Sequence, residues 1–349
     1  MNRRKITVAV TGLNNIDSPG PGIPVIRALK ESTLFDVRII GLSYESLEPG
    51  IYMHDLVDKS YAIPLPSAGS QALFSRLQYI HDIEKIDVII PNFDAELHNF
   101  ILLVSQLKQQ LNIATFLPNR EVFDSRHKSE LPEFGKKYGI NVPDSKMIFS
   151  IADFKKIEGD FEYPMVVKGK FYDASIAYNQ EQAISYFHKI SAKWGLPIII
   201  QEYVTGTEVN VTAIGDGEGT CIGAVAMRKL YITDKGKAWA GITLDDPELI
   251  AISKKVVENT HWRGGCELEF IKNKKDEYYL LEMNPRFPAW VYLAVGCGQN
   301  HPEAMVAMAL GEKVVPFETY DQGKMFIRYS YDLIVKMDEF EKISTFGEL

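Results

Sequence analysis

Short apolar runs alternate with helical patterns over the first 120 residues of this 349-residue chain. Apolar strands are predicted at residues 6–10, 37–41 and 87–90, and helices from about residue 23, around 73–80 and near 96–109. Strands that alternate with helices favour a parallel sheet with helices on its faces. The pattern therefore predicts an N-terminal Rossmann-like α/β domain over residues 1–120.

Beyond Pro118 the pattern changes and strands become more frequent. A helix over 126–138 is expected to end at Gly139, because glycine is favoured just after a helix. Further strands are predicted at 164–168, 174–178, 197–202, 207–215, 219–229, 265–272 and 277–283, and helices at 181–192, 246–258, 287–295 and 302–310. We expect a small central lid domain at 121–202, a C-terminal antiparallel-sheet domain at 203–330, and a tail at 331–349 without a recognisable motif.

The two strands around the polar turn at 273–276 form a predicted hairpin that carries acidic side chains. Side chains two apart on a strand share a face, so Glu267 lies with Glu269, and Glu282 lies with Asn284. The intervening apolar residues are expected to face a core: Leu268, Phe270, Leu281 and Met283. Clustered carboxylates repel one another, and oxygen ligands without Cys or His favour Mg²⁺ or Mn²⁺. The alternative is a solvated acidic surface.

Arg286 follows this hairpin directly, where a guanidinium could meet a phosphate held by the same metal. A second candidate lies in the run QEYVTGTEVNVTAIG, which starts at Gln201. Backbone groups around Glu202 and Val204 could pair with an adenine edge, and the Glu208 carboxylate could accept hydrogen bonds from both ribose hydroxyls. A plain hairpin with an exposed glutamate is the alternative interpretation.

Composition narrows the classes of function. A formal net charge of −8 and an isoelectric point near 5.5 argue against a nucleic-acid surface. No apolar run is long enough to span a bilayer, and the start MNRRKITVAVTGLNN is interpreted as a first strand and not a signal peptide. Three widely spaced cysteines predict neither a zinc site nor a disulfide framework, which fits a cytoplasmic protein.

The run from Glu267 to Phe287 resembles the metal-binding signature near the C-terminal end of the ATP-grasp fold, and the order of the motifs resembles that superfamily over nearly the whole chain. The resemblance implies that Glu269, Glu282 and Asn284 bind Mg²⁺ or Mn²⁺, as two ions. It also implies that Gln201 contacts the adenine amino group and that Glu208 binds the ribose of ATP.

The same resemblance implies that Lys128, at the start of a helix, and Lys168, at the end of a strand, contact the phosphates of ATP. Arg228 and Lys229 are weaker candidates for charge near a triphosphate or an acyl phosphate. One departure concerns the loop after Lys168: the run KGKFYDASIAY holds only Gly169, where many relatives have a glycine-rich loop. Either the loop is short, with Ser175 and Tyr172 acting by their side chains, or the phosphate lid is degenerate.

The implied activity is that of an ATP-dependent carboxylate–amine ligase similar to the large subunit of carbamoyl phosphate synthase. Such an enzyme phosphorylates a carboxylate, releases ADP and lets an amine attack, with Arg286 and Lys168 stabilising charge in transfer. Small-molecule substrates are expected, amino acids or peptides among them, and a homodimer would be ordinary. The alternatives are an ATP-binding sensor or partner subunit without catalysis, and an NAD-type oxidoreductase built on the N-terminal sheet.

Two polar segments lie at the predicted ligand edge of the N-terminal sheet. The segment TGLNNIDSPGPGIPVIRAL resembles a phosphate-binding turn before a helix. In PNFDAEL, Asp94 and Glu96 follow a strand, and helix capping by Asp94 is the favoured interpretation. The side chains that select the substrate are expected in loops such as 12–24, 92–96, 231–243 and 287–298. The aromatic residues Trp239, Trp290 and Tyr292 predict a small, partly aromatic pocket.

Overall fold

The fold is described from a computed structural model that covers residues 3–170 and 173–349. The chain divides into two compact units, and each is discontinuous in sequence. Unit 1 comprises Met1–Arg120, Asn210–Glu267 and Asn284–Leu349, and unit 2 comprises Glu121–Val209 and Leu268–Met283. The four-part division at residues 120, 202 and 330 stays a prediction.

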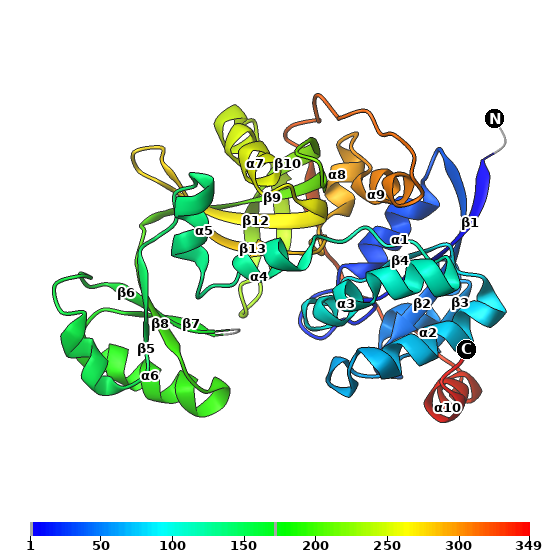
Figure 1. Ribbon diagram of the computed structural model, residues 1–349, viewed down its shortest axis with the longest axis horizontal. Helices are drawn as coiled ribbons and strands as arrows, with labels where there is room; N and C mark the ends of the chain where they lie inside the picture. Colours follow the sequence, from blue (N-terminus) through cyan, green and yellow to red (C-terminus); the bar gives the residue numbers. More distant parts are fainter. Residues whose placement is uncertain (1–2, 171–172) are drawn as a thin grey trace. The chain divides into compact units, whose positions relative to one another are not determined.

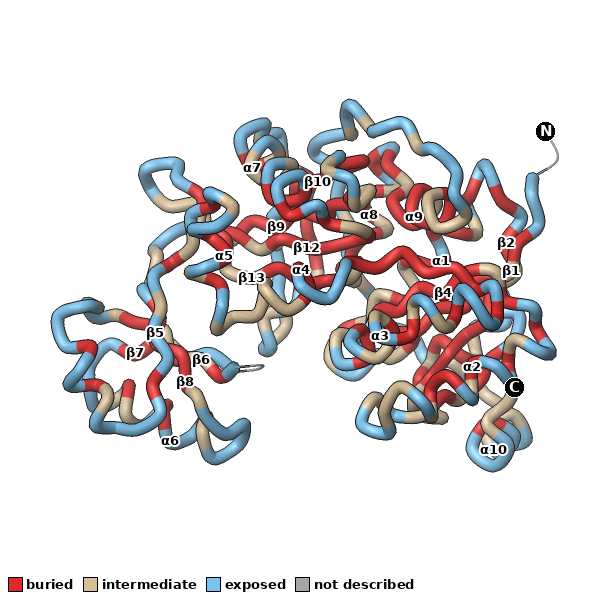
Figure 2. Tube along the Cα trace, in the orientation of Figure 1, coloured by how far each residue is buried: buried red, intermediate tan, exposed pale blue. Residues whose placement is uncertain are grey.

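The N-terminal part of unit 1 is a four-stranded parallel sheet in the order β3-β2-β1-β4 (Figure 1). Its strands are β1 (Arg4–Val10), β2 (Phe35–Ser43), β3 (Lys59–Ala62) and β4 (Val88–Ile90). Its helices are α1 (Gly22–Lys30), α2 (Ser70–Glu84) and α3 (Asp94–Leu111), with short 3₁₀ turns η1 (Pro49–Tyr52) and η2 (Pro66–Ala68). The predicted parallel sheet is confirmed, and β1, β2 and β4 are largely buried (Figure 2).

Antiparallel strands form the second sheet, whose order is β13-β12-β9-β10-β11-β14. The strands are β9 (Gly206–Asp216), β10 (Cys221–Ile232), β11 (Ala238–Thr243), β12 (Arg263–Asn273), β13 (Tyr278–Asn284) and β14 (Met325–Ile327). Unit 1 also contains α7 (Pro247–Asn259), α8 (Tyr292–Gly296), α9 (His301–Ala309) and α10 (Met337–Phe346). The last helix occupies the tail in which the sequence offered no motif, and its residues are mostly exposed (Figure 2).

Unit 2 is built on an antiparallel sheet in the order β5-β8-β6-β7, with α6 packed on it (Figure 1). The elements are α4 (Arg120–Ser125), α5 (Leu131–Tyr138), β5 (Ser145–Ile148), η3 (Ile151–Lys156), β6 (Met165–Gly169), β7 (Ala174–Ala177), α6 (Gln180–Trp194) and β8 (Ile198–Glu202). Its core holds apolar side chains such as Val167, Phe187 and Ile200. Unit 2 also includes β12 from Leu268 onward and β13 as far as Met283.

Two predicted helices were wrong in extent. The helix expected over 126–138 is two helices, α4 and α5, separated by a turn at 126–130. Helix α5 begins only at Leu131 because Pro132, which lacks an N–H, is tolerated in the first turn of a helix and not in its interior. The helix expected over 287–295 is shortened to α8, since the chain first makes a tight turn in which the Val291 N–H donates to the Pro288 carbonyl.

The predicted hairpin of β12 and β13 is confirmed, with one correction to its faces. Leu268, Phe270 and Met283 are buried as expected, whereas Leu281 is only half-buried. Leu280 is fully buried instead, and its N–H donates to the Asn141 carbonyl 2.8 Å away. The segment that follows α5 therefore lies along the edge of β13 at Leu280.

Candidate functional site

Two lysines and two glutamates lie together in unit 2. The ammonium of Lys128 is 3.3 Å from Oε2 of Glu282. Lys168 lies close enough to be affected by the charges of Lys128, Glu282 and Glu269. Burial, and then the positive charge of Lys128, lower the pKa of Lys168 to about 8, while the negative charges of Glu282 and Glu269 act to raise it. We call Lys128, Lys168, Glu269 and Glu282 the lysine–glutamate cluster. Four of the residues that the resemblance selected are thus neighbours.

Regular structure fixes the position of Lys168. It is the fourth residue of β6, whose buried Met165 and Val167 anchor the strand in the core of unit 2. In the sheet it pairs with Ala174 of β7 and Ile199 of β8. Since β6 ends at Gly169 and β7 begins at Ala174, only four residues connect them. Tyr172 lies outside the described residues.

Lys128 is held differently from the expectation. It does not open a helix but lies in the turn at 126–130, between α4 and α5. Its side chain is nevertheless about three-quarters buried, at 23% exposure, against 35% for that of Glu282. A half-buried pair of this kind interacts more strongly than a fully exposed one, because less water screens it.

The residues predicted to bind the nucleoside lie on β8, on β9 and between them. Gln201 is 3% exposed on β8, where it pairs with Ser145 of β5 and Val166 of β6. Glu202 ends β8, and its N–H donates to the carbonyl of Asp144 at 2.8 Å. Val204 lies in the connection at 203–205, and Glu208 is half-buried on β9. Their roles toward adenine and ribose stay predictions.

A buried carboxylate, Glu267, organises the other candidate residues in unit 1. Its Oε1 accepts from the indole N–H of Trp290 at 2.7 Å, and its Oε2 accepts from the amide of Asn284 at 3.2 Å. Nη1 of Arg286 lies 3.7 Å from the same Oε2. Glu267 and Asn284 are only 7% and 9% exposed. We call Glu267, Asn284, Arg286 and Trp290 the Glu267 cluster.

Arg286 also contacts the N-terminal sheet's ligand edge. Its Nε donates to Oδ2 of Asp94 at 3.1 Å, so Asp94 serves as an ion-pair partner and not as the helix cap that the sequence favoured. The capping role at the start of α3 belongs to Glu96, whose Oε1 accepts from the N–H groups of Asn92 and Phe93 at 2.9 Å. Arg286 thereby tethers the segment after β13 to the segment after β4.

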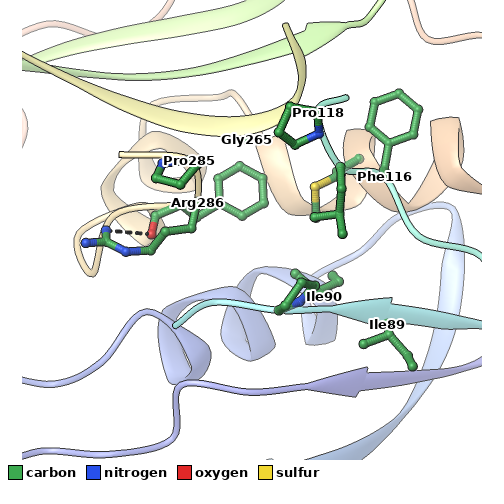
Figure 3. Close-up of a pocket in the computed structure, with 11 residues that line it drawn as sticks. Ile89, Ile90, Phe116, Pro118, Gly265, Pro285 and Arg286 are labelled. Carbon is green, nitrogen blue, oxygen red and sulfur yellow. Dashed lines mark hydrogen bonds between the residues drawn. The ribbon is translucent and has the colours of Figure 1, made fainter. Parts of the chain in front are cut away.

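Figure 3 shows Arg286 and Pro285 beside Gly265, Phe116 and Ile90, around a cavity of about 10 Å³. The dashed line marks the bond from Nη1 of Arg286 to the Phe287 carbonyl at 3.3 Å. A cavity of this volume holds about one water molecule, so it is a packing gap.

Arg228 belongs to unit 1. It is exposed on β10, opposite Ile242 of β11, and no hydrogen bond or ion pair of its side chain is found within residues 3–170 and 173–349. Across the same described ranges, no group of three or more His, Cys, Asp or Glu side chains is arranged to hold a metal. Glu269 and Glu282 are two carboxylates, a number that suits Mg²⁺, which keeps several waters and binds through one or two carboxylates plus phosphates.

Sequence reasoning missed the central place of Glu267. The alternation along β12 placed Glu267 on the hairpin but did not indicate its partners. Trp290, which donates to Glu267, lies 23 positions later in the chain, and Asp94, which pairs with Arg286, lies 192 positions before Arg286. Only the acidic residue at a buried strand position could have signalled the cluster, because buried carboxylates need partners.

Comparison with known proteins finds a matching family model and similar relatives. A family model described as "ATP-grasp in the biosynthetic pathway with Ter operon" matches residues 196–329. The carbamoyl phosphate synthase large chain of Clostridium beijerinckii is 24% identical over 331 residues, which are 90% of this chain and 30% of that protein. That of Agathobacter rectalis is 22% identical over 274 residues, 74% of this chain and 25% of that protein. The chain therefore spans less than a third of the length of these relatives.

Solved structures share the fold. Biotin carboxylase from Campylobacter jejuni superposes with a TM-score of 0.70 at 17% identity, over 91% of this chain and 74% of that one. An ADP complex of N5-carboxyaminoimidazole ribonucleotide synthetase superposes with a TM-score of 0.69 at 14% identity, over 93% of this chain and 81% of that one. L-amino acid ligase from Bacillus licheniformis superposes with a TM-score of 0.64 at 16% identity, over 90% of this chain and 76% of that one.

These matches, together with the order of the sheets, define the fold as ATP-grasp. Residues 196–329 match an ATP-grasp family model, and the chain as a whole has the ATP-grasp fold. The predicted superfamily and fold class are thereby confirmed. No helix among the described residues has both the length and the apolar character needed to cross a membrane.

Proposed function

We propose that this protein is an ATP- and Mg²⁺-dependent ligase that activates a carboxylate as an acyl phosphate and joins it to an amine. The lysine–glutamate cluster carries the proposal. Lys128 and Glu282 lie 3.3 Å apart, and Lys168 shares their field with Glu269. Two cations and two carboxylates in one half-buried place suit a ligand that brings both phosphates and a metal.

The proposed reaction balances in two steps. An oxygen of the substrate carboxylate attacks the γ-phosphorus of ATP, the bond from that phosphorus to the β-γ bridging oxygen breaks, and ADP leaves. The amine nitrogen then attacks the acyl carbon, the carbon–oxygen bond to phosphate breaks, and the amine gives its proton to a base or to water. The products are an amide, ADP and inorganic phosphate.

Residues of this chain have separate tasks in the proposal. Glu269, Glu282 and Asn284 would hold Mg²⁺, which when bound neutralises charge on the β- and γ-phosphates. Lys128 and Lys168 would bind phosphate oxygens as mobile point charges. Arg286, fixed by Asp94 and Glu267, offers a guanidinium that could hold the substrate carboxylate or the acyl phosphate. Gln201 and Glu208 would bind adenine and ribose.

A second candidate function is ATP binding without transfer. The observation that favours it is the glycine-poor connection of four residues between β6 and β7, which gives few backbone N–H groups for a closing phosphate lid. Such a protein would bind ATP and release no ADP with any acceptor.

The test is Mg²⁺-dependent release of ADP and phosphate from ATP across pools of small carboxylic acids, each pool with and without added amines. The ligase proposal expects release that requires one pool and a metal ion. A protein that binds ATP and releases ADP with no pool would contradict it and support the non-catalytic alternative.

A further inference from the structure

Unit 1 contains a cavity of about 690 Å³ that none of the proposed ATP or metal ligands lines. It lies between the start of α1, the segment 289–296 with α8, and the edge strand β14 with the residues that follow it. Its volume falls in the range of pockets for small ligands, roughly 300–1,000 Å³. The cavity is therefore large enough for a metabolite.

The walls are aromatic and apolar. The aromatic side chains on them are Trp290, Tyr292, Phe326, Tyr329 and Tyr331. Tyr329 and Tyr331 stack with ring centroids 5.7 Å apart. Tyr329 is 78% exposed and Ile327, on the same wall, is 70% exposed. Apolar side chains that gather at a concave surface, open to water, are a mark of a binding site.

Charge on the walls favours an anion. The charged lining residues are Arg27, Lys324, Arg328 and a single acid, Asp55. Lys324 is paired with Asp321 at 2.8 Å. The Arg27 guanidinium lies over the Tyr292 ring, 3.8 Å from its centroid, and the hydroxyl of the same tyrosine donates to the carboxylate of Glu31, which is not a lining residue. Among the lining residues the positive excess therefore falls on Arg27 and Arg328, while Glu31 and Glu267 act on them from outside the lining.

Hydrogen bonds hold one wall of the cavity in place. Nη1 of Arg328 donates to the hydroxyl of Ser18 at 2.8 Å, and Nη2 donates to the carbonyl of Ala289 at 2.8 Å. One guanidinium thus joins β14's end to the loop before α1 and to the segment before α8. Such fixed polar bonds preorganise the cavity for a ligand.

One carboxylate connects this wall with the proposed reaction residues. Glu267 accepts from Trp290, which lines the cavity, and from Asn284, a proposed metal ligand. Arg286 contacts the same Oε2. Trp290 on the cavity wall therefore shares one carboxylate with Asn284 and Arg286, two residues that have proposed roles in the reaction.

We propose that this cavity takes the carboxylic acid substrate and selects one with an aromatic or branched apolar body over acids of the size of acetate or bicarbonate. The part of this inference that makes the bound acid a substrate rests on the proposed ligase function. Apolar bulk fills the space between Trp290 and Tyr329, and the cationic rim at Arg27 and Arg328 favours the anionic form of the ligand.

Binding of 3-phenylpropionate to the full chain, measured by isothermal titration calorimetry, tests the cavity independently of turnover. We expect it to bind at least about tenfold more tightly than propionate, because the phenyl ring buries apolar surface. It should also bind more tightly than 3-phenylpropan-1-ol and 2-phenylethylamine. Equal binding of propionate, or tighter binding of the alcohol or the amine, would overturn the proposal.

Gly296 allows the cavity to be filled. A Cβ at this lining position meets no atom within 4 Å, so Gly296→Leu adds bulk without a clash at its base. We expect the variant to weaken binding of 3-phenylpropionate at least about tenfold. The control is Ala68→Leu, which adds similar bulk at an exposed position outside the lining. Unchanged binding in Gly296→Leu, or equal loss in both variants, would refute the assignment.

The two proposals fail in different ways. Binding that depends on Gly296, without ADP release from any acid, would overturn the ligase and leave a site for apolar acids. ADP release that is equal for acetate and 3-phenylpropionate, with no binding that Gly296→Leu disturbs, would overturn the cavity assignment and leave the ligase. Glu282→Ala protein should bind 3-phenylpropionate like the wild type, since Glu282 lines no part of the cavity.

Discussion

The hydrogen bond between Glu267 and Trp290 should be a strong energetic coupling in unit 1. The two side chains meet at 2.7 Å, and the residues are 7% and 5% exposed. Glu267→Ala removes a buried charge that also serves Asn284 and Arg286, and it leaves the indole N–H without a partner. Breaking such a buried pair costs about 3–5 kcal/mol of the free energy of unfolding.

Trp290→Phe removes the N–H donor and keeps most of the ring, so we expect a loss of about 1–3 kcal/mol. The double variant should be less destabilised than the sum of the single variants. The difference, the coupling energy, is expected at about 1.5–3 kcal/mol, the range for a hydrogen bond to a charged group.

Urea unfolding followed by circular dichroism measures all four proteins without depending on tryptophan fluorescence. The control cycle pairs Glu267→Ala with Trp194→Phe, because Trp194 donates its indole N–H to a different carboxylate, that of Asp173, at 2.8 Å. Additivity is expected there. A Glu267–Trp290 coupling within about 0.5 kcal/mol of zero would refute the central role of Glu267.

Three further predictions follow from the site and the fold. Glu282→Ala should abolish ADP release while unfolding shifts by less than about 1 kcal/mol, because its ion pair with Lys128 is half-exposed; retained turnover would contradict the metal assignment. Burial raises the pKa of Glu96 to about 7, against four hydrogen bonds that lower it, so the native state binds the extra proton between pH 4.5 and 7. The contribution of this group to the free energy of unfolding should therefore fall by up to about 3 kcal/mol as pH rises through that window. Urea unfolding at pH 5 and pH 8 measures this pH dependence, and Glu96→Gln should remove it. The same pH dependence in the variant would contradict the assignment. Gly264→Ala should cost about 3 kcal/mol or more, since φ is +101° and the new Cβ would lie 2.4 Å from the Phe116 carbonyl oxygen; a thermal midpoint within 2 °C of the wild type would be against it.

Much of the fold could be predicted from hydrophobic periodicity. Strands β1, β2 and β4 alternate with helices along the chain, and β12 and β13 flank a polar turn, so local pattern and tertiary structure agree. Short edge elements such as β5 and β14 were missed, because three or four residues give too little pattern to separate a strand from a loop. The Lys128 helix was wrong because the preference of Pro132 for a first turn was overlooked.

The candidate site was predictable where order along the chain carries the information. The first and last of Lys128, Lys168, Glu269 and Glu282 are 154 positions apart, yet the resemblance selected all four, and they lie together. The Glu267 cluster could not be found in this way. No local spacing links Trp290 to Glu267 or Asp94 to Arg286, because these contacts arise only when distant segments are packed.

The origin of the phosphate oxygen tests the central claim most directly. An acid that supports ADP release is labelled with ¹⁸O in its carboxylate and incubated with ATP, Mg²⁺ and an amine, and the inorganic phosphate is analysed by mass. Activation as an acyl phosphate predicts one ¹⁸O atom in each phosphate released, because the bond that breaks is between carbon and oxygen. Phosphate without ¹⁸O, or release of AMP and pyrophosphate in place of ADP, would contradict the account.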